Sequence, residues 1–152
     1  MMNTALFEKM INYYESKAFA HTYIFGYRMA GNIYMTQVDA TMLPYVMTLD
    51  SASRGQGASL RFKPNKNVKA LLMSKNATLL CSEELFNDMV DNSKYNRGEI
   101  FEKLVTEHFG QVWEKDNIPY TEAGDIEVDG VAIQIKFEKA TFTNERSMAV
   151  MA

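Results

Sequence analysis

The dipeptide Asp129-Gly130 stands between two segments in which apolar and polar residues alternate. Asp-Gly favours the two-residue hairpin turn, whose central residues both need a positive φ. Counting outward from this turn places Asp125 opposite Gln134, with their Cβ atoms expected about 4.5–5.5 Å apart. Lys136 lies two residues further on the same face of its strand. One face of the predicted hairpin therefore presents an acid, an amide and an ammonium group together.

The other face of this hairpin carries only apolar side chains and is expected to pack on a core. It consists of Ile126, Val128, Val131, Ile133, Ile135 and Phe137. A slip of one residue would turn this whole set to solvent, so burial of the apolar face specifies the register strongly.

A helix is predicted from Asn96 to Phe109, shortly before the hairpin. Asn96 is a favourable N-cap, and Glu99 follows three residues later in capping-box spacing. Apolar residues at helical intervals, with one histidine, define its buried face: Ile100, Phe101, Leu104, Val105, His108 and Phe109. At about 100° per residue, Glu102 falls at the boundary of that face and Glu99 nearly opposite its centre. We therefore expect Glu102 to be an acid at the edge of the buried face, Glu99 a capping residue and His108 a core histidine.

The hairpin resembles the PD-(D/E)xK nuclease superfamily, in the variant with Gln at the middle position. Asp125 stands at the Asp of the motif, and Gln134, Ile135 and Lys136 stand at its last three positions. The glycine and Phe-Glu pattern within residues 98–105 is similar to the first helix of many of these nucleases.

The resemblance covers about residues 96–146 and contains two departures from the motif. Gly124 stands where the signature has Pro, and Gln134 replaces an acidic residue, which removes one charge from the metal site. A neutral amide oxygen still binds Mg²⁺, but less strongly than a carboxylate does.

The resemblance implies a single α/β domain with a restriction-endonuclease-like core, a mixed β-sheet flanked by helices. It implies Mg²⁺-dependent hydrolysis of phosphodiester bonds in DNA by an endonuclease, with Mn²⁺ as a substitute metal. Asp125, Gln134 and the Ile135 carbonyl would hold the metal, and Glu102 would complete its ligand shell directly or through water. Lys136 would orient or deprotonate the attacking water and neutralise charge that develops on phosphorus.

A second interpretation is a nuclease-like fold that has lost catalysis and binds DNA or inhibits another protein, as in a phage or mobile-element context. The replacement of an acid by Gln134 and the acidic surroundings of the hairpin favour it. An acidic small protein that occupies a nucleic-acid site on another protein is a third interpretation.

Positive charge is concentrated in residues 51–82, although the whole chain has a net charge of −3. This segment contains six basic residues and no acid: Arg54, Arg61, Lys63, Lys66, Lys69 and Lys75. Lys and Arg contacts to phosphate dominate nonspecific affinity for nucleic acid. We expect Arg54, Arg61, Lys63, Lys66 and Lys69 to bind the DNA backbone. The alternative is that these residues are only solvated, on exposed faces of a strand and a helix and on a loop.

The 152 residues, 47% of them hydrophobic and 23% charged, are ordinary for one domain spanning residues 1–152. No apolar run reaches the roughly 18 residues of a membrane span, and the N-terminus lacks the pattern of a signal peptide, so a cytoplasmic location is expected. The lone Cys81 cannot form an internal disulfide and is expected to be a small buried hydrophobe. A homodimer would suit a symmetric DNA substrate.

The remaining periodicity predicts further elements between and beyond these motifs. They are helices over 4–17, 65–75, 83–90 and 144–152, strands over 23–29, 33–38 and 60–63, a three-residue turn at 30–32, a flexible loop at 51–59 and a turn or cap at 141–143. Leu85, Phe86 and Met89 are expected to face inward from the third of these helices.

Overall fold

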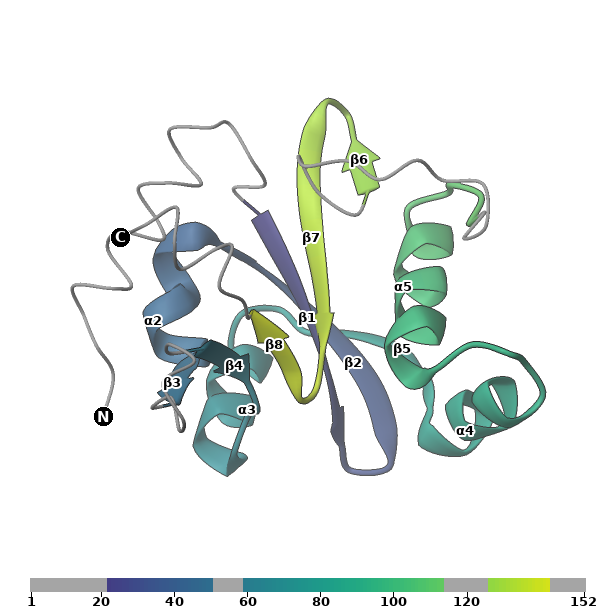
Figure 1. Cartoon of the computed structure of the whole chain (residues 1–152), viewed down its shortest axis with the longest axis horizontal. Coiled ribbons are helices and arrows are strands. Elements are labelled where there is room, and N and C mark those ends of the chain that lie inside the picture. The colour runs from purple at the N-terminus through teal and green to yellow at the C-terminus, as the bar shows by residue number, and fades with distance from the viewer. Residues whose placement is uncertain (1–21, 51–58, 114–125, 143–152) are drawn as a thin grey trace.

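The computed structural model describes residues 22–50, 59–113 and 126–142 of the chain (Figure 1). Its strands are β1 (Thr22–Met29), β2 (Asn32–Asp39), β3 (Thr48–Asp50), β4 (Ser59–Phe62), β5 (Thr78–Ser82), β6 (Ile126–Val128), β7 (Val131–Phe137) and β8 (Ala140–Phe142). Its helices are α2 (Leu43–Val46), α3 (Lys66–Met73), α4 (Glu83–Asp91) and α5 (Arg97–His108), with a 3₁₀ turn at Ala40–Met42. The predicted α/β class is confirmed.

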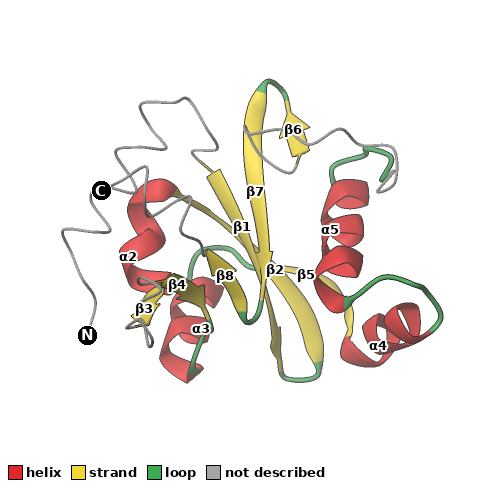
Figure 2. Cartoon of the chain, viewed as in Figure 1, coloured by secondary structure: helices red, strands yellow, loops and turns green. Residues whose placement is uncertain are grey.

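A mixed five-stranded sheet in the order β5-β2-β1-β7-β6 forms the centre of the molecule. Strand β1 pairs antiparallel with β2 and parallel with β7, and β6 pairs antiparallel with β7. Helices α4 and α5 lie on one side of this sheet, whereas α2, α3 and the small sheet β3-β4-β8 lie on the other (Figure 2). The β6-β7 hairpin therefore stands at one edge, next to α5.

Each face of the central sheet packs on its own apolar cluster. The α5 side contains Ile24, Ile33, Met35, Phe86, Ile100, Phe101, Val105, Ile126, Ile133, Ile135 and Phe137. The opposite side contains Tyr23, Phe25, Tyr27, Val38, Leu43, Val46, Met47, Phe62 and Leu72. Because both faces are covered, β1 is buried along most of its length, as in sheets with a layer on each side.

Helix α5 approaches the sheet closely because β1 has a glycine beneath it. A Cβ atom on Gly26 would lie 2.2 Å from Cζ of Phe101. The Phe101 ring is fully buried, and its centroid lies 5.0 Å from that of Phe137 on β7. These contacts fix the distance between α5 and β7, the two elements that carry the candidate site.

Both hairpins of the central sheet close through two-residue turns with positive φ. Asp129 and Gly130 have φ values of 51° and 81°, and the predicted pairing of Val128 with Val131 and of Ile126 with Ile133 is confirmed. Between β1 and β2 the turn is Ala30-Gly31, since Asn32 already pairs with Met29. The expected three-residue turn at 30–32 is therefore wrong by one residue.

Side-chain caps fix the starts of α3 and α4. The Asn65 side chain accepts hydrogen bonds from the backbone N–H groups of Asn67 and Val68 at the start of α3, and Ser82 accepts one from Leu85 at the start of α4. The predicted inward face of α4 is partly wrong, because Leu85 was expected to face inward and is 52% exposed. Only Phe86 of α4 is fully buried.

Several other expectations need correction. His108 is exposed in the last turn of α5, beyond the part of the helix that packs on the sheet, and Thr106 is buried in its place. Val131 is 45% exposed because it lies at the tip of its hairpin. Residues 78–82 form the edge strand β5, which was not predicted, and Cys81 on this strand is only half-buried instead of buried as expected. Residues 140–142 form β8, where a turn or cap was expected.

Three expected elements lie outside the described residues: the helices over 4–17 and 144–152, and the loop over 51–59 except Ser59, which begins β4. Among the helices that the structure describes, none is both long enough and apolar enough to cross a membrane.

Candidate active site

The first turn of α5 is fixed by the predicted capping box. The Asn96 side chain accepts a hydrogen bond from the Glu99 backbone N–H at 2.8 Å, and the Glu99 carboxylate accepts one from the Asn96 backbone N–H at 3.1 Å. This reciprocal pair satisfies two donors that a helix start leaves without partners. The expectation that Glu99 caps the helix is confirmed.

Glu102 lies one turn further along α5, at the edge of its buried face. Its carboxylate accepts a hydrogen bond of 3.4 Å from the indole Nε1 of Trp113, and its backbone carbonyl accepts one of 2.7 Å from the Thr106 hydroxyl. The Trp113 ring stands edge-on to Tyr95, with 4.8 Å between centroids. Trp113 thus limits the positions that the Glu102 side chain can take.

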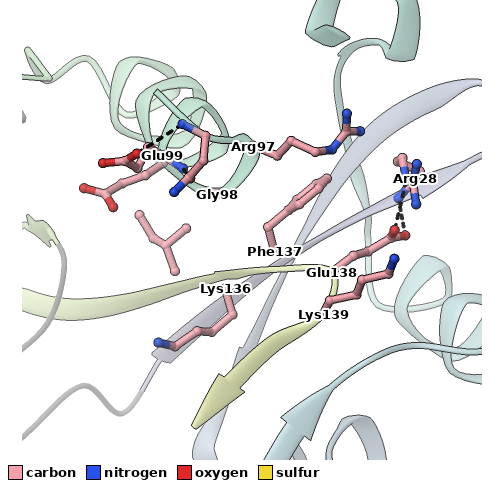
Figure 3. Close-up of a pocket in the computed structure, with 11 residues that line it drawn as sticks. Arg28, Arg97, Gly98, Glu99, Lys136, Phe137, Glu138 and Lys139 are labelled. Atoms are coloured by element: carbon pink, nitrogen blue, oxygen red, sulfur yellow. Dashed lines mark hydrogen bonds and ion pairs between the residues drawn. The ribbon is translucent and has the colours of Figure 1, made fainter. Parts of the chain in front are cut away.

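A cavity of about 700 Å³ opens between the start of α5 and the end of β7 (Figure 3). Its lining combines residues of both signs of charge: Arg28, Asn96, Arg97, Gly98, Glu99, Glu102, Ile135, Lys136, Phe137, Glu138 and Lys139. Of the predicted site residues, Glu102, Ile135 and Lys136 meet at this cavity.

Alternation along β7 puts Gln134 and Lys136 on one face of the strand, as predicted. Ile133, Ile135 and Phe137 are buried on the other face, toward α5. Figure 3 accordingly shows the Lys136 side chain leaving β7 on the side away from Glu99. Glu102 and Lys136 both line the cavity, but the Lys136 side chain extends from the face of β7 opposite to the one that packs on α5.

The structure does not place two of the predicted metal ligands at the cavity. Gln134 does not line it, and Asp125 lies outside the part of the chain that the structure describes. The antiparallel pairing of β6 with β7 is described as far as Ile126, which lies opposite Ile133. The predicted pairing of Asp125 with Gln134 would be the next one along.

The described donors fit Mg²⁺ in their chemistry. Glu102 and Ile135 line one cavity, and a carboxylate and a backbone carbonyl are oxygen ligands of the kind that Mg²⁺ prefers. Within residues 22–50, 59–113 and 126–142, no group of three His, Cys, Asp or Glu residues is close enough to hold a metal ion. The other carboxylate of the predicted site, that of Asp125, lies outside these residues.

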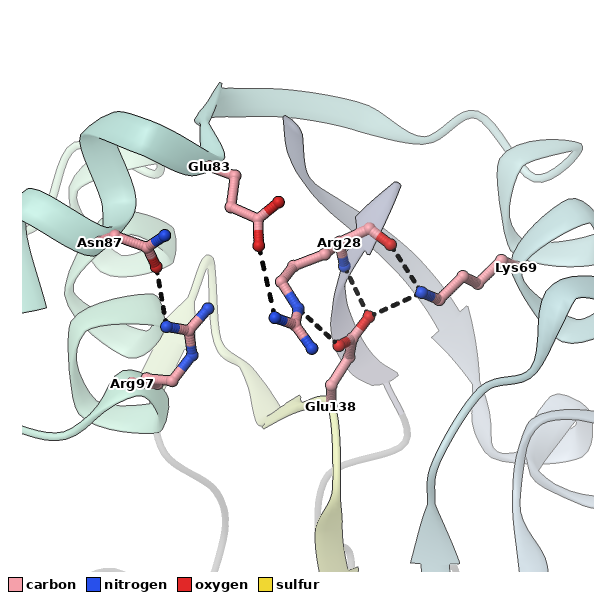
Figure 4. A network of polar contacts seen from close by, with 6 residues as sticks. All are labelled: Arg28, Lys69, Glu83, Asn87, Arg97 and Glu138. Atoms are coloured by element: carbon pink, nitrogen blue, oxygen red, sulfur yellow. Dashed lines mark hydrogen bonds and ion pairs between the residues drawn. The ribbon is translucent and has the colours of Figure 1, made fainter. Parts of the chain in front are cut away.

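A network of charged residues closes the other end of the cavity (Figure 4). The Glu138 carboxylate accepts hydrogen bonds from the Arg28 backbone N–H at 2.7 Å and from Arg28 Nε at 2.9 Å. Lys69 Nζ lies 3.1 Å from the same carboxylate and donates to the Arg28 carbonyl at 2.7 Å. Arg28 also pairs with Glu83 at 3.3 Å.

This network changes the acidity of Glu138. Burial alone would raise the pKa of the Glu138 carboxyl, but the hydrogen bonds from Arg28 and Lys69 outweigh it and leave the pKa below its usual value. The hydrogen bond to Glu138 raises the pKa of the Arg28 guanidinium. Glu138 therefore stays ionised although its side chain is only 9% exposed.

Sequence reasoning missed this network. Glu138 continues the polar face of β7, which by itself indicates a solvated acid. Its partners lie on β1 and α3, and the local pattern gives no sign of either contact.

The predicted nucleic-acid-binding residues separate into three groups. Arg61 on β4, Lys63 in the following loop and Lys66 at the start of α3 are exposed. Lys69 instead belongs to the network around Glu138. Arg54 lies outside the described residues.

No protein-family model, no curated protein and no solved structure matches this chain.

Proposed function

We propose that this protein is a Mg²⁺-dependent endonuclease that hydrolyses phosphodiester bonds in DNA, with its site on a restriction-endonuclease-like core. The observation that carries the proposal is the meeting of Glu102 from α5 with Ile135 and Lys136 from β7 at one cavity. The resemblance of the Gln134-Ile135-Lys136 strand to nuclease motifs gives this meeting its chemical interpretation.

In this proposal Lys136 contributes positive charge where the phosphate group reacts. Its ammonium group has three donors that can bind a phosphate oxygen or orient the attacking water. Because β7 is paired along its length with β1, the Lys136 backbone is fixed and only the side chain must adjust.

Glu102 would take part in binding the metal, together with the Ile135 carbonyl, Asp125 and Gln134. The hydrogen bond from Trp113 holds one of its carboxylate oxygens and so restricts the orientation of the carboxylate. Bound Mg²⁺ would supply Lewis-acid stabilisation of the phosphate and lower the pKa of a water molecule.

The proposal is tested by incubating supercoiled plasmid DNA with the protein and Mg²⁺ or Mn²⁺. We expect nicked or linear product that disappears with a chelator and in Asp125→Ala, Glu102→Gln and Lys136→Ala. Lys103→Ala is a matched control, since Lys103 lies on α5 but pairs with Glu107 at 3.0 Å, outside the cavity lining. If the wild-type protein and the site variants give equal product, the nuclease proposal is wrong.

A second candidate function is a nuclease-like module that binds DNA or another protein without cleaving it. The position of Gln134, outside the cavity that Glu102 and Lys136 line, favours this alternative. The two candidates differ in metal dependence: an active nuclease should gain thermal stability with Mn²⁺, whereas a module without a metal site should not.

A further inference from the structure

The cavity has a cationic end that the proposed metal site does not use. Figure 3 shows the guanidinium groups of Arg28 and Arg97 and the ammonium group of Lys139 at the end away from Glu99. All three side chains belong to its lining. They come from β1, the first turn of α5 and the β7-β8 turn, so the fold brings them together from distant parts of the chain.

Arg97 carries the clearest sign of a missing ligand. Its guanidinium lies 5.0 Å from the centroid of the Phe86 ring, and its Nη1 donates to the Asn87 side chain at 2.8 Å. Its Nη2 is buried and has no hydrogen-bond acceptor among the residues that the structure describes. A buried charged donor without an acceptor costs free energy, and a bound ion or ligand that supplies the acceptor is one explanation for such a group.

Arg28 is held in place on the same side of the cavity. Its Nε and Nη1 bind Glu138 and Glu83, which fixes the plane of the guanidinium. Figure 4 shows the Arg28 guanidinium held by Glu138 and Glu83, and that of Arg97 held by Asn87. Both guanidinium groups carry further N–H donors that a phosphate can bind.

We propose that Arg97, Arg28 and Lys139 bind a phosphate group at this end of the cavity. Phosphate oxygens are strong acceptors, and a small rotation of the Arg97 guanidinium would bring its Nη2, which is closed to solvent in this structure, within reach of one of them. This inference rests on the proposed function in one respect: we take the ligand to be a backbone phosphate of DNA next to the one that is hydrolysed. A free phosphate or a nucleotide has the same chemistry and is distinguished by the experiment.

The test measures DNA binding in the presence of a chelator, so that cleavage is not required. The probe is a fluorescein-labelled duplex oligonucleotide, and its affinity is followed by anisotropy over a series of salt concentrations. We expect Arg97→Gln to weaken binding about tenfold or more and to lower the slope of log affinity against log salt by about 0.9, the value for one lost phosphate contact. Lys103→Gln removes the same charge from the same helix outside the cavity, and it should bind like the wild-type protein.

A second variant separates a loss of binding from a loss of stability, because Arg97 also contacts Phe86 and Asn87 of α4. Lys139 is exposed and has a φ of 69°, a conformation that Asn tolerates better than most residues, so Lys139→Asn removes the charge without straining the turn. It should lower the salt slope while leaving the melting temperature unchanged. Affinities and slopes equal to wild type in both variants would overturn the binding of a DNA phosphate at this end of the cavity.

Inorganic phosphate at constant ionic strength distinguishes the source of the ligand. If DNA affinity is unchanged in both variants but phosphate raises the melting temperature of wild type and not of Arg97→Gln, the ligand is a free phosphate and the assignment to DNA is overturned. The nuclease proposal fails separately: a wild-type protein that never cleaves DNA but loses affinity in Arg97→Gln has the phosphate site without the catalysis.

Discussion

The Glu138 carboxylate binds Arg28 at two positions, its backbone N–H and its guanidinium Nε, although the residues are 110 positions apart in the sequence. A third contact, between backbone groups, runs from the Glu138 N–H to the Gly26 carbonyl at 3.0 Å and extends the parallel pairing of β1 with β7. Lys69 joins α3 to the same carboxylate. One acid therefore fixes the end of β7 relative to β1 and to the layer on the far side of the sheet.

Replacing Glu138 should destabilise the fold. In Glu138→Ala, Lys69 and Arg28 would lose their shared acceptor in a partly buried site, at a cost of about 2–3 kcal/mol in the free energy of unfolding. Glu127→Ala is a control, because Glu127 is an exposed acid on β6 and should change stability by no more than about 0.5 kcal/mol. Urea unfolding of both variants measures the difference, and equal midpoints would contradict a structural role for the network.

The same network predicts a pH dependence of stability. The pKa of Glu138 is lower in the folded protein than its usual value of 4.5, so ionised Glu138 stabilises the fold. This contribution is complete above pH 4.5 and disappears as the pH falls through the lower, folded-state pKa. The stability difference between wild type and Glu138→Gln should therefore be largest above pH 4.5 and shrink below it. A difference that stays constant from pH 7 to pH 3 would show that Glu138 does not titrate with folding.

Gly26→Ala should displace α5 from the sheet. The added Cβ would meet three atoms of the Phe101 ring at 2.2–2.6 Å, and this ring is fully buried and cannot swing away. Overpacking of this kind costs about 1–3 kcal/mol, and the shift of α5 should also move Glu102, so that cleavage falls even where the protein stays folded.

Matched variants check this explanation by thermal melting and the plasmid assay. Gly98→Ala places its Cβ no closer than 3.5 Å to another group, so both stability and cleavage should be retained. Combining Gly26→Ala with Phe101→Leu should recover part of the loss, because the two positions are in contact. Additive losses in the double variant would refute the proposed clash.

Local chemistry made the two elements of the candidate site predictable from the sequence. Asp129-Gly130 determined the register of the hairpin, and Asn96 with Glu99 determined the start of α5. These features depend on neighbours within a few residues. The contact of Glu138 with Arg28 depends on how β1 and β7 come together as parallel neighbours, which no local pattern contains.

The sequence also did not show on which face of β7 each residue of the candidate site lies. Alternation correctly predicted that Lys136 and Gln134 share a face of β7. It could not predict that α5 would pack on the opposite face, so that Glu102 meets Lys136 at the cavity while Gln134 lies outside it.

The basic segment should contain two kinds of lysine. Lys63 and Lys66 are exposed, so Lys63→Gln and Lys66→Gln should each lower the salt slope of duplex binding by about 0.9 with little change in stability. Lys69→Gln should instead reduce stability, because Lys69 binds Glu138 and the Arg28 carbonyl. Anisotropy titrations and thermal melts on the three variants separate these effects. A salt slope that changes only in Lys69→Gln would reverse the assignment.

Gln134→Glu tests whether Gln134 is a metal ligand. The substitution restores the acid of the nuclease motif, and a carboxylate binds Mg²⁺ or Mn²⁺ more strongly than an amide does. If Gln134 is a ligand, Mn²⁺ should raise the melting temperature of Gln134→Glu more than that of wild type, since a tenfold gain in affinity adds about 1.4 kcal/mol at saturating metal. Gln37→Glu makes the same change at an exposed position on β2 and should respond to Mn²⁺ like the wild-type protein. Equal shifts in all three proteins would remove Gln134 from the metal site and favour the binding module over the nuclease.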